Sequence, residues 1–222
     1  MGAGLGSLTL ALLRAGATVL ALELDRALLP ALREVVGGSP RARVERVDAM
    51  RADWQVLLGE GTWKMASNLP YNVAVPVVLD LLGKAPNVDP MLVMVQREVG
   101  ERLASGPGDP QFGAVSLRVA YRAGARVTRR IPRTVFWPQP RVESVLVRLE
   151  RRPPPVDTPQ QDLFRLVDEG FRQRRKTMAN ALVRLGLDRA EAEAAMERAG
   201  LDPKVRAEEL GLEEFARLAE SL

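Results

Sequence analysis

The sequence predicts an α/β fold with a mainly parallel sheet, followed by a small all-helical domain. Apolar strand-like runs alternate with helical patterns up to about residue 104, as in chains that build parallel sheets. Polar or glycine residues stand where several of these runs end. A stiff segment, Arg152-Pro153-Pro154-Pro155, then precedes a region with helical periodicity only. We therefore expect one domain over residues 1–151 and a second over residues 158–222.

The composition narrows the possible chemistry. The 222 residues are 46% hydrophobic, which is enough for a packed core. No apolar run reaches the roughly 18 to 20 residues that span a bilayer, and no signal-peptide pattern opens the chain. We expect a cytoplasmic protein without membrane contact. With no cysteine and no histidine, thiolate nucleophiles and imidazole bases are excluded, and we expect no metal site.

Basic residues are concentrated in one part of the chain. Between Arg122 and Arg184 there are fifteen Arg or Lys and six Asp or Glu. A solvated arginine-rich surface is one explanation, and the ratio of 28 Arg to 4 Lys indicates a GC-rich coding sequence that raises arginine everywhere. The local excess nevertheless favours a polyanionic partner such as nucleic acid.

A glycine-rich turn with Gly2, Gly4 and Gly6 opens the chain and leads into a helix. Glycine permits positive φ and close approach to a ligand, and a helix N-terminus offers free N–H groups. The next apolar run, residues 17–24, reads as a buried strand ending at Glu23. An acid roughly 20 residues past such a loop is placed to accept hydrogen bonds from ribose hydroxyls. A solvated strand end is the alternative.

A helix is expected over residues 25–36, closed by Gly37-Gly38, and a short strand over residues 44–47 ends at Asp48. Asp48 could accept from an adenine amino group while a neighbouring N–H reaches a ring nitrogen. Glycines, Glu23 and Asp48 on successive strand ends predict an adenosyl cofactor lying across the carboxyl ends of the sheet.

The next strand end carries Asn68-Leu69-Pro70-Tyr71, between an apolar run at residues 63–66 and a helix over residues 73–83. These residues offer a side-chain amide, a backbone carbonyl before a rigid proline, and a flat π-face. The combination fits a flat nitrogen heterocycle with an exocyclic amine. The alternative is a plain strand-to-helix turn, in which Asn68 caps the helix and Tyr71 is core.

The remaining pattern supplies five further elements before the linker and four helices after it. We expect a strand over residues 89–96, buried on both faces as a central parallel strand would be. A helix over residues 97–104 and a mobile loop at 105–108 follow, and residues 112–121 read as a helix. Strands over 125–131 and 142–149 should form an antiparallel pair, joined by a proline-held loop with Phe136 and Trp137. That loop carries binding residues or forms a hydrophobic plug. The C-terminal helices are expected over residues 161–174, 177–185, 188–199 and 208–220.

With these residues in place, the sequence resembles the bacterial 16S rRNA adenine N6-dimethyltransferases along essentially its whole length. The stretches that carry the resemblance are residues 2–9, 23–25, 47–50, 68–71, 96–99, 136–144, 171–177 and 206–208. The resemblance implies a Rossmann-like S-adenosylmethionine-dependent methyltransferase sheet of seven strands, with a small C-terminal all-α domain. It also implies methyl transfer to two adjacent adenosines in the 3′-terminal hairpin of 16S rRNA, two methyls to each base.

The resemblance also assigns residues to roles. Cofactor contacts are expected from Gly2, Gly4, Gly6, Glu23, Leu24, Asp48, Ala49 and Asn68. Catalysis is expected from Asn68, Leu69, Pro70 and Tyr71, with Tyr71 and Phe136 stacking on a flipped adenine. RNA contacts are expected from Arg141, Arg172, Arg174, Arg175 and Lys176. The implied cofactor is S-adenosylmethionine, and the implied partner is 16S rRNA or the immature 30S subunit, bound by a monomer.

One departure from the family concerns the sheet. In the family a first, central strand and a segment that closes over the cofactor precede the glycine loop, and here Met1 stands next to the loop. Our hypothesis is a misplaced start, with a GTG valine codon read as Met. We expect a chain that begins at Met1 to leave two strands unpaired and part of the cofactor site open, and therefore to be unstable and nearly inactive.

Two other functions remain open at this point. A 23S rRNA adenine N6-methyltransferase of the macrolide-resistance type shares the catalytic motif, although Leu69 and the Arg174-Arg175-Lys176-Thr177 stretch favour the 16S enzyme. A catalytically impaired ribosome-assembly factor could keep the fold and bind RNA without methylating it.

Overall fold

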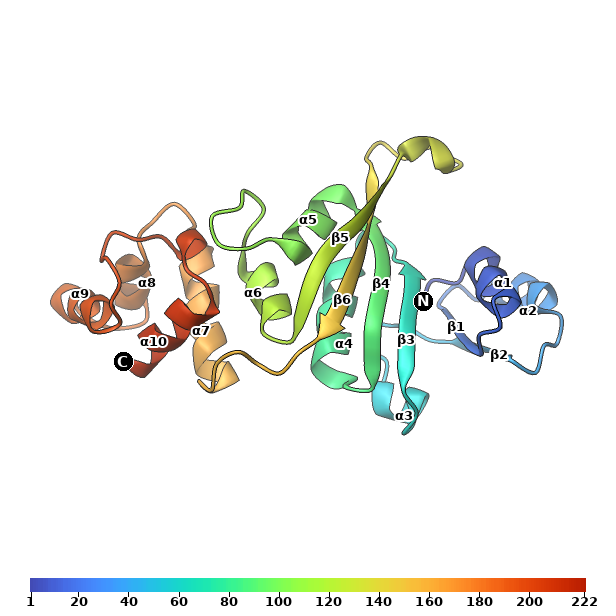
Figure 1. Ribbon diagram of the computed structural model, residues 1–222, viewed down its shortest axis with the longest axis horizontal. Helices are drawn as coiled ribbons and strands as arrows, with labels where there is room; N and C mark the ends of the chain where they lie inside the picture. Colours follow the sequence, from blue (N-terminus) through green and yellow to red (C-terminus); the bar gives the residue numbers. More distant parts are fainter. The chain divides into compact units, whose positions relative to one another are not determined.

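The computed structural model describes all 222 residues, which form two compact units (Figure 1). The sheet unit comprises residues 1–100 and 127–150, and the helical unit comprises residues 101–126 and 151–222. Residues 101–126 therefore group with the C-terminal helices, whereas the domains expected from the sequence divide at the proline-rich linker. Those domain boundaries stay a prediction.

The sheet unit alternates strands and helices along the chain, as predicted. Its elements up to the first crossing between units are α1 (Ser7–Arg14), β1 (Val19–Glu23), α2 (Leu29–Val36), β2 (Ala42–Arg46), α3 (Trp54–Leu58), β3 (Trp63–Asn68), α4 (Ala74–Lys84), β4 (Val88–Gln96) and α5 (Arg97–Ala104). The chain returns through β5 (Ala123–Ile131), the short 3-10 helix η1 (Arg133–Val135) and β6 (Ser144–Arg151).

The strands form two separate sheets. Strands β1 and β2 are parallel, with Val19 opposite Ala42 and Glu23 opposite Arg46. The larger sheet has the order β3-β4-β6-β5, in which β3 and β4 are parallel and β4 and β6 antiparallel. In each parallel pair the carboxyl ends of the two strands lie at the same edge of the sheet. Residues that follow neighbouring strands can therefore contribute to one site.

Strands β1 and β3 are not hydrogen-bonded to each other. A cavity of about 540 Å³ lies between them, and Figure 1 places the N-terminus there. Apolar side chains dominate its walls, among them Leu12, Leu20 and Leu22 on one side and Trp54, Met65 and Leu81 on the other. The low stability expected for this chain stays a prediction.

Strand β4 differs from the expected fully buried strand. Met91, Val93 and Val95 are fully buried, but Leu92 on the opposite face is 39% exposed. The core of the larger sheet therefore lies on one face, where Val77, Val78 and Leu81 of α4 are also fully buried. When a strand sequence is apolar on both faces, the sequence alone does not show which face will be covered by other elements of the fold.

The helical unit contains α6 (Ala114–Ala120), α7 (Gln160–Arg172), α8 (Met178–Arg184), α9 (Arg189–Arg198), the 3-10 helix η2 (Ala207–Glu209) and α10 (Leu212–Glu220). The predicted helix over residues 112–121 is confirmed. Its Leu117 shares one core with Leu163, Met178, Leu182 and Phe215 of the C-terminal helices. No helix of the chain is long and apolar enough to cross a membrane.

Two glycines in helices of the sheet unit predict opposite effects of alanine. A Cβ on Gly100 would overlap Cγ2 of Val145 and lie 2.9 Å from Cγ2 of Val147, so Gly100→Ala should destabilise the unit by about 1–3 kcal/mol. Gly83 in α4 has no atom within 4 Å of that position. Gly83→Ala should therefore stabilise by about 0.5–1 kcal/mol through the helix preference of alanine.

Urea unfolding followed by tryptophan fluorescence measures both changes, since Trp54, Trp63 and Trp137 all belong to the sheet unit. A Gly100→Ala protein as stable as Gly83→Ala would contradict the packing of α5 against β6.

Candidate functional site

The carboxylate of Glu23 fixes the glycine loop to the end of β1. The residue is only 7% exposed. Its Oε2 accepts a hydrogen bond from the Gly4 N–H at 2.8 Å, and its Oε1 accepts from the Leu24 and Asp25 N–H groups at 2.8 and 2.9 Å. A carboxylate has about four acceptor positions, so roughly one remains for a ligand hydroxyl.

The glycine loop depends on backbone conformations that other residues rarely adopt. Gly2, Gly4 and Gly6 all have positive φ, at 61°, 56° and 88°. At Gly6 a Cβ would also lie 2.9 Å from Cδ1 of Leu32, so the missing side chain lets α1 approach α2. At Gly4 nothing lies within 4 Å, and its backbone is open on that side.

A cavity of about 280 Å³ lies along this loop and reaches Asn68. Its size is just below the roughly 300–1,000 Å³ of typical ligand pockets. It is lined by Met1, Gly2, Ala3, Gly4, Leu5, Ser7, Leu8, Thr9, Leu12, Val19, Leu20, Ala21, Ala66 and Asn68. The structure thus brings two of the predicted glycines, Gly2 and Gly4, to one cavity with Asn68, whereas Gly6 does not line it. Glu23 supports the loop and does not line the cavity.

Asp48 lies near Glu23 but outside this cavity. The Val47 N–H donates to the Glu23 carbonyl at 3.1 Å, which continues the parallel pairing past β2. One Asp48 oxygen accepts from the Met50 N–H at 2.9 Å, and the other lies 3.9 Å from Nε of Arg51. The predicted cofactor residue Leu24 is exposed and Ala49 is half-buried. These three residues form the outer part of the same strand-end edge.

Asn68 is the last residue of β3, and its exposed side-chain amide makes no hydrogen bond within the protein. Helix α4 is preceded by Val73 without any side-chain cap, so Asn68 does not cap it. The Leu69 N–H donates to the Met94 carbonyl at 3.1 Å, while the Leu69 carbonyl accepts no hydrogen bond in the chain. The motif therefore presents two free acceptor oxygens.

The glycine loop and the Asn68–Tyr71 motif are in contact. A Cβ on Gly2 would lie 3.4 Å from Cδ of Pro70, and the hydroxyl of buried Ser67 donates to the Met1 carbonyl at 2.7 Å. Burial lowers the pKa of the Met1 amino group, against the opposing effect of the Glu23 charge. The free acceptors therefore lie beside the loop.

Tyr71 is 39% exposed, and its hydroxyl lies 3.5 Å from Oγ of Ser144, the first residue of β6. It is not a plain core residue. Phe136 is half-buried in the loop before β6, and no ring contact joins it to Tyr71. The two predicted stacking residues are therefore not stacked on each other.

The predicted RNA-binding residues of the helical unit surround the turn between α7 and α8. The Arg174 side chain donates to Oε2 of Glu208 at 2.6 Å and to the Pro110 carbonyl at 3.0 Å, and Arg172 pairs with Glu169 at 3.2 Å. Arg175 and Lys176 are exposed and have no partner. In the sheet unit, Arg141 is likewise exposed and unpaired.

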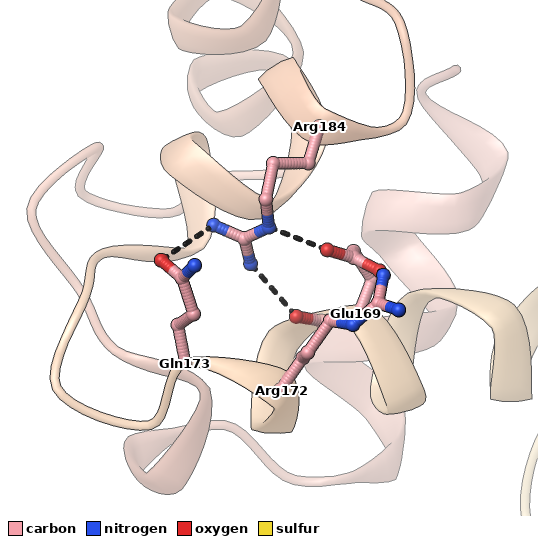
Figure 2. Close-up of polar contacts among 4 residues, drawn as sticks. All are labelled: Glu169, Arg172, Gln173 and Arg184. Atoms are coloured by element: carbon pink, nitrogen blue, oxygen red, sulfur yellow. Dashed lines mark hydrogen bonds and ion pairs between the residues drawn. The ribbon is translucent and has the colours of Figure 1, made fainter.

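Arg184 of α8 is hydrogen-bonded to the C-terminal part of α7 and to the residue after it, a contact that the sequence did not reveal (Figure 2). Its guanidinium donates to the Glu169 carboxylate, to the Glu169 carbonyl at 2.9 Å and to Oε1 of Gln173 at 3.2 Å. The side-chain hydrogen bond from Arg184 lowers the pKa of Glu169, with a smaller contribution from Arg172. Helical spacing places Glu169 and Gln173 on one face of α7, but only the tertiary fold shows that Arg184 faces them.

A family model described as ribosomal RNA adenine dimethylase matches residues 1–222. The curated relative named ribosomal RNA small subunit methyltransferase A from Thermobifida fusca is 48% identical, with 99% of this chain and 78% of the relative covered. The protein of the same name from Streptomyces coelicolor is 44% identical, with coverage of 99% and 79%.

Two solved structures have the same fold. A dimethyladenosine transferase from Plasmodium falciparum gives a TM-score of 0.77 at 19% identity, with 98% of this chain and 86% of that chain covered. The 23S rRNA methyltransferase ErmE gives 0.73 at 23% identity, with coverage of 100% and 88%. The predicted α/β methyltransferase fold is therefore confirmed.

The three hydrogen bonds to Glu23 predict a large effect of a small substitution. Glu23→Gln keeps the shape but turns an NH₂ group toward a backbone N–H, so at least one of the three part-buried hydrogen bonds is lost. We expect a loss of about 1–3 kcal/mol in the unfolding free energy of the sheet unit, measured by urea unfolding with tryptophan fluorescence.

The matched control is Glu45→Gln, because Glu45 forms an exposed pair with Arg43 and should change stability by less than about 0.5 kcal/mol. Equal unfolding midpoints for Glu23→Gln and Glu45→Gln would show that Glu23 does not hold the loop.

Proposed function

The chain belongs to the ribosomal RNA adenine dimethylase family, and we propose that it transfers methyl groups from S-adenosylmethionine to N6 of two adjacent adenosines near the 3′ end of small-subunit rRNA. The observation that carries this proposal is the pair of free acceptors, the Asn68 amide oxygen and the Leu69 carbonyl, beside the glycine loop. The identities of 37–48% to curated small-subunit rRNA methyltransferases support it.

The two acceptors suit an exocyclic adenine amine. Its nitrogen is a poor nucleophile because the lone pair is conjugated into the ring. Hydrogen bonds from both N6–H groups to Asn68 and Leu69 would hold the nitrogen pyramidal and turn the lone pair outward. The same oxygens stabilise the positive charge that develops on nitrogen, so they bind the transition state more strongly than the ground state. The product amine can lose its proton to water, so no histidine or cysteine is needed.

The glycine loop and the strand ends fit the methyl donor. S-adenosylmethionine, when bound, supplies an electrophilic methyl group on a positively charged sulfur. The open backbone at Gly4 would let it approach the loop closely, with Gly2 and Asn68 lining the same cavity, while Gly6 keeps the loop packed against α2. The remaining acceptor position of Glu23 would receive a ribose hydroxyl, and Asp48, with Leu24 and Ala49, would contact the adenine. Holding the methyl donor and the adenine close together in the reactive orientation supplies a large part of the rate enhancement.

The target adenine would be flipped out of its loop and stacked on Tyr71, with Phe136 on the other segment of the site. Each such stack contributes roughly 1–3 kcal/mol. Tyr71 has the exposure that stacking requires, and Pro70 restricts the backbone before it.

Phosphates of the rRNA would be bound by Arg141 in the sheet unit and by Arg172, Arg174, Arg175 and Lys176 in the helical unit. Arg175 and Lys176 are the strongest candidates, because no carboxylate competes for them. Binding through such contacts should weaken steeply with salt. We further propose that the protein acts in the cytoplasm as a monomer, on 16S rRNA within an immature 30S subunit.

The alternatives are a 23S rRNA adenine methyltransferase and an assembly factor that binds RNA without methylating it. The shared fold with the 23S enzyme ErmE does not favour the first, since 23% identity indicates fold alone. An assembly factor that does not methylate RNA would leave the free amide of Asn68 without a catalytic role.

Asn68→Ala should abolish methyl transfer to unmethylated 30S subunits, with a loss of at least about 100-fold, while S-adenosylmethionine binding by calorimetry falls by much less. Incorporation of labelled methyl groups measures the first quantity. Gln55→Ala is the matched control, because Gln55 is an exposed amide on α3 outside the site and should methylate as its parent does. An Asn68→Ala protein with parental activity would overturn the assignment.

A further inference from the structure

The arm formed by residues 127–143 extends beyond the ends of β3 and β4 (Figure 1). It contains most of β5, the 3-10 helix η1 and the loop that leads into β6. Strand β5 is one of the two edge strands of the larger sheet, and residues 127–130 are exposed on both of its faces. The arm therefore presents its side chains to solvent and adds little to the core.

The arm carries a concentrated positive charge that the protein does not neutralise. Arg129, Arg130, Arg133 and Arg141 are exposed and have neither an ion pair nor a side-chain hydrogen bond. The one acid of the segment, Glu143, is engaged by Nη1 of Arg97 at 3.0 Å. Unpaired arginines on one projecting element repel one another and attract a polyanion.

Trp137, in the loop after η1, is 99% exposed, and Val135, the last residue of η1, is 63% exposed. A fully exposed indole leaves a large apolar surface in water, which is typical of a binding site for a partner. An aromatic ring between arginines fits a nucleic acid whose bases are unpaired, because such bases offer a face for stacking. Double-stranded RNA hides those faces, so it is the weaker fit.

The base of the arm is fixed next to the Asn68–Tyr71 motif. The Arg97 N–H donates to the Glu143 carbonyl at 2.9 Å, and Gln96 pairs with Ser144 across β4 and β6. The Tyr71 hydroxyl lies 3.5 Å from that same Ser144. RNA held by the arm would therefore be held in a defined position relative to Tyr71.

We propose that this arm is a second RNA-binding element. Trp137 stacks on an unpaired base that flanks the target adenosines, and Arg129, Arg130 and Arg133 contact the phosphates around it. The inference rests on the proposed function only in taking rRNA as the ligand. Trp137 and the three arginines position the RNA and do not touch the reacting nitrogen.

The test measures RNA binding directly by fluorescence anisotropy at several salt concentrations. The probes are a synthetic RNA hairpin with two adjacent adenosines in its loop and a fully paired RNA duplex of equal length. Trp137→Ala should weaken hairpin binding by about 5- to 150-fold and leave duplex binding unchanged, while Trp137→Phe keeps most of the affinity.

The triple variant Arg129→Gln/Arg130→Gln/Arg133→Gln should weaken binding of both probes. It should also reduce the slope of log K against log salt by about 2, at about 0.7 for each contact with single-stranded RNA. The control triple, Arg14→Gln/Arg33→Gln/Arg41→Gln, removes the same charge from exposed, unpaired arginines elsewhere in the sheet unit and should leave the slope unchanged.

Parental hairpin binding by Trp137→Ala, or equal losses for the two triple variants, would overturn the inference. Methyl transfer to unmethylated 30S subunits by the unsubstituted chain is measured in parallel. Its absence would count against the proposed function, whereas the binding data decide the role of the arm independently.

Discussion

The hydrogen bonds to the Glu23 carboxylate are the constraint on which the rest of the site depends. They join Gly4 in the middle of the glycine loop to Leu24 and Asp25 after β1. Three glycines with positive φ give the loop little preference for one conformation, so a buried anion that accepts backbone N–H groups has to hold it. Because Gly2 of this loop lies against Pro70, the same carboxylate also helps to keep the loop beside the free oxygens of Asn68 and Leu69.

The polar groups given supporting or binding roles in the two units fall into two kinds. Glu23, Arg174 and Arg184 are bonded to the protein itself and hold the loop and the turn in place. The Asn68 amide and Leu69 carbonyl, and the charges of Arg175 and Lys176, are left without partners in the chain. A polar group without a partner in the protein can form a new hydrogen bond or ion pair with a ligand without breaking an existing one. The unpaired groups therefore mark where substrate would bind. The groups that are already bonded within the protein hold their segments in place before a ligand arrives. They therefore reduce the conformational entropy that binding would otherwise cost.

Much of the fold could be predicted from the sequence. Helix α5 begins and ends where the pattern places it, and the helix near residue 117 is confirmed, since both have strong local signals. Helix α3 was missed, although Asp53 caps it, because five residues carry too little periodicity. The pairing of Glu23 with the loop and of Arg184 with α7 joins residues far apart in sequence, which no local pattern encodes. The roles of Asn68, Tyr71 and the basic residues stay predictions.

The central claim is that this chain dimethylates two adjacent adenosines of small-subunit rRNA. The most direct measurement is mass spectrometry of nuclease fragments from unmethylated 30S and 50S subunits, each incubated with the purified protein and S-adenosylmethionine. The account predicts N6,N6-dimethyladenosine at two neighbouring positions near the 3′ end of the small-subunit rRNA and none in the large-subunit rRNA. Dimethyladenosine in the large-subunit rRNA, or methylation of neither rRNA, would contradict it.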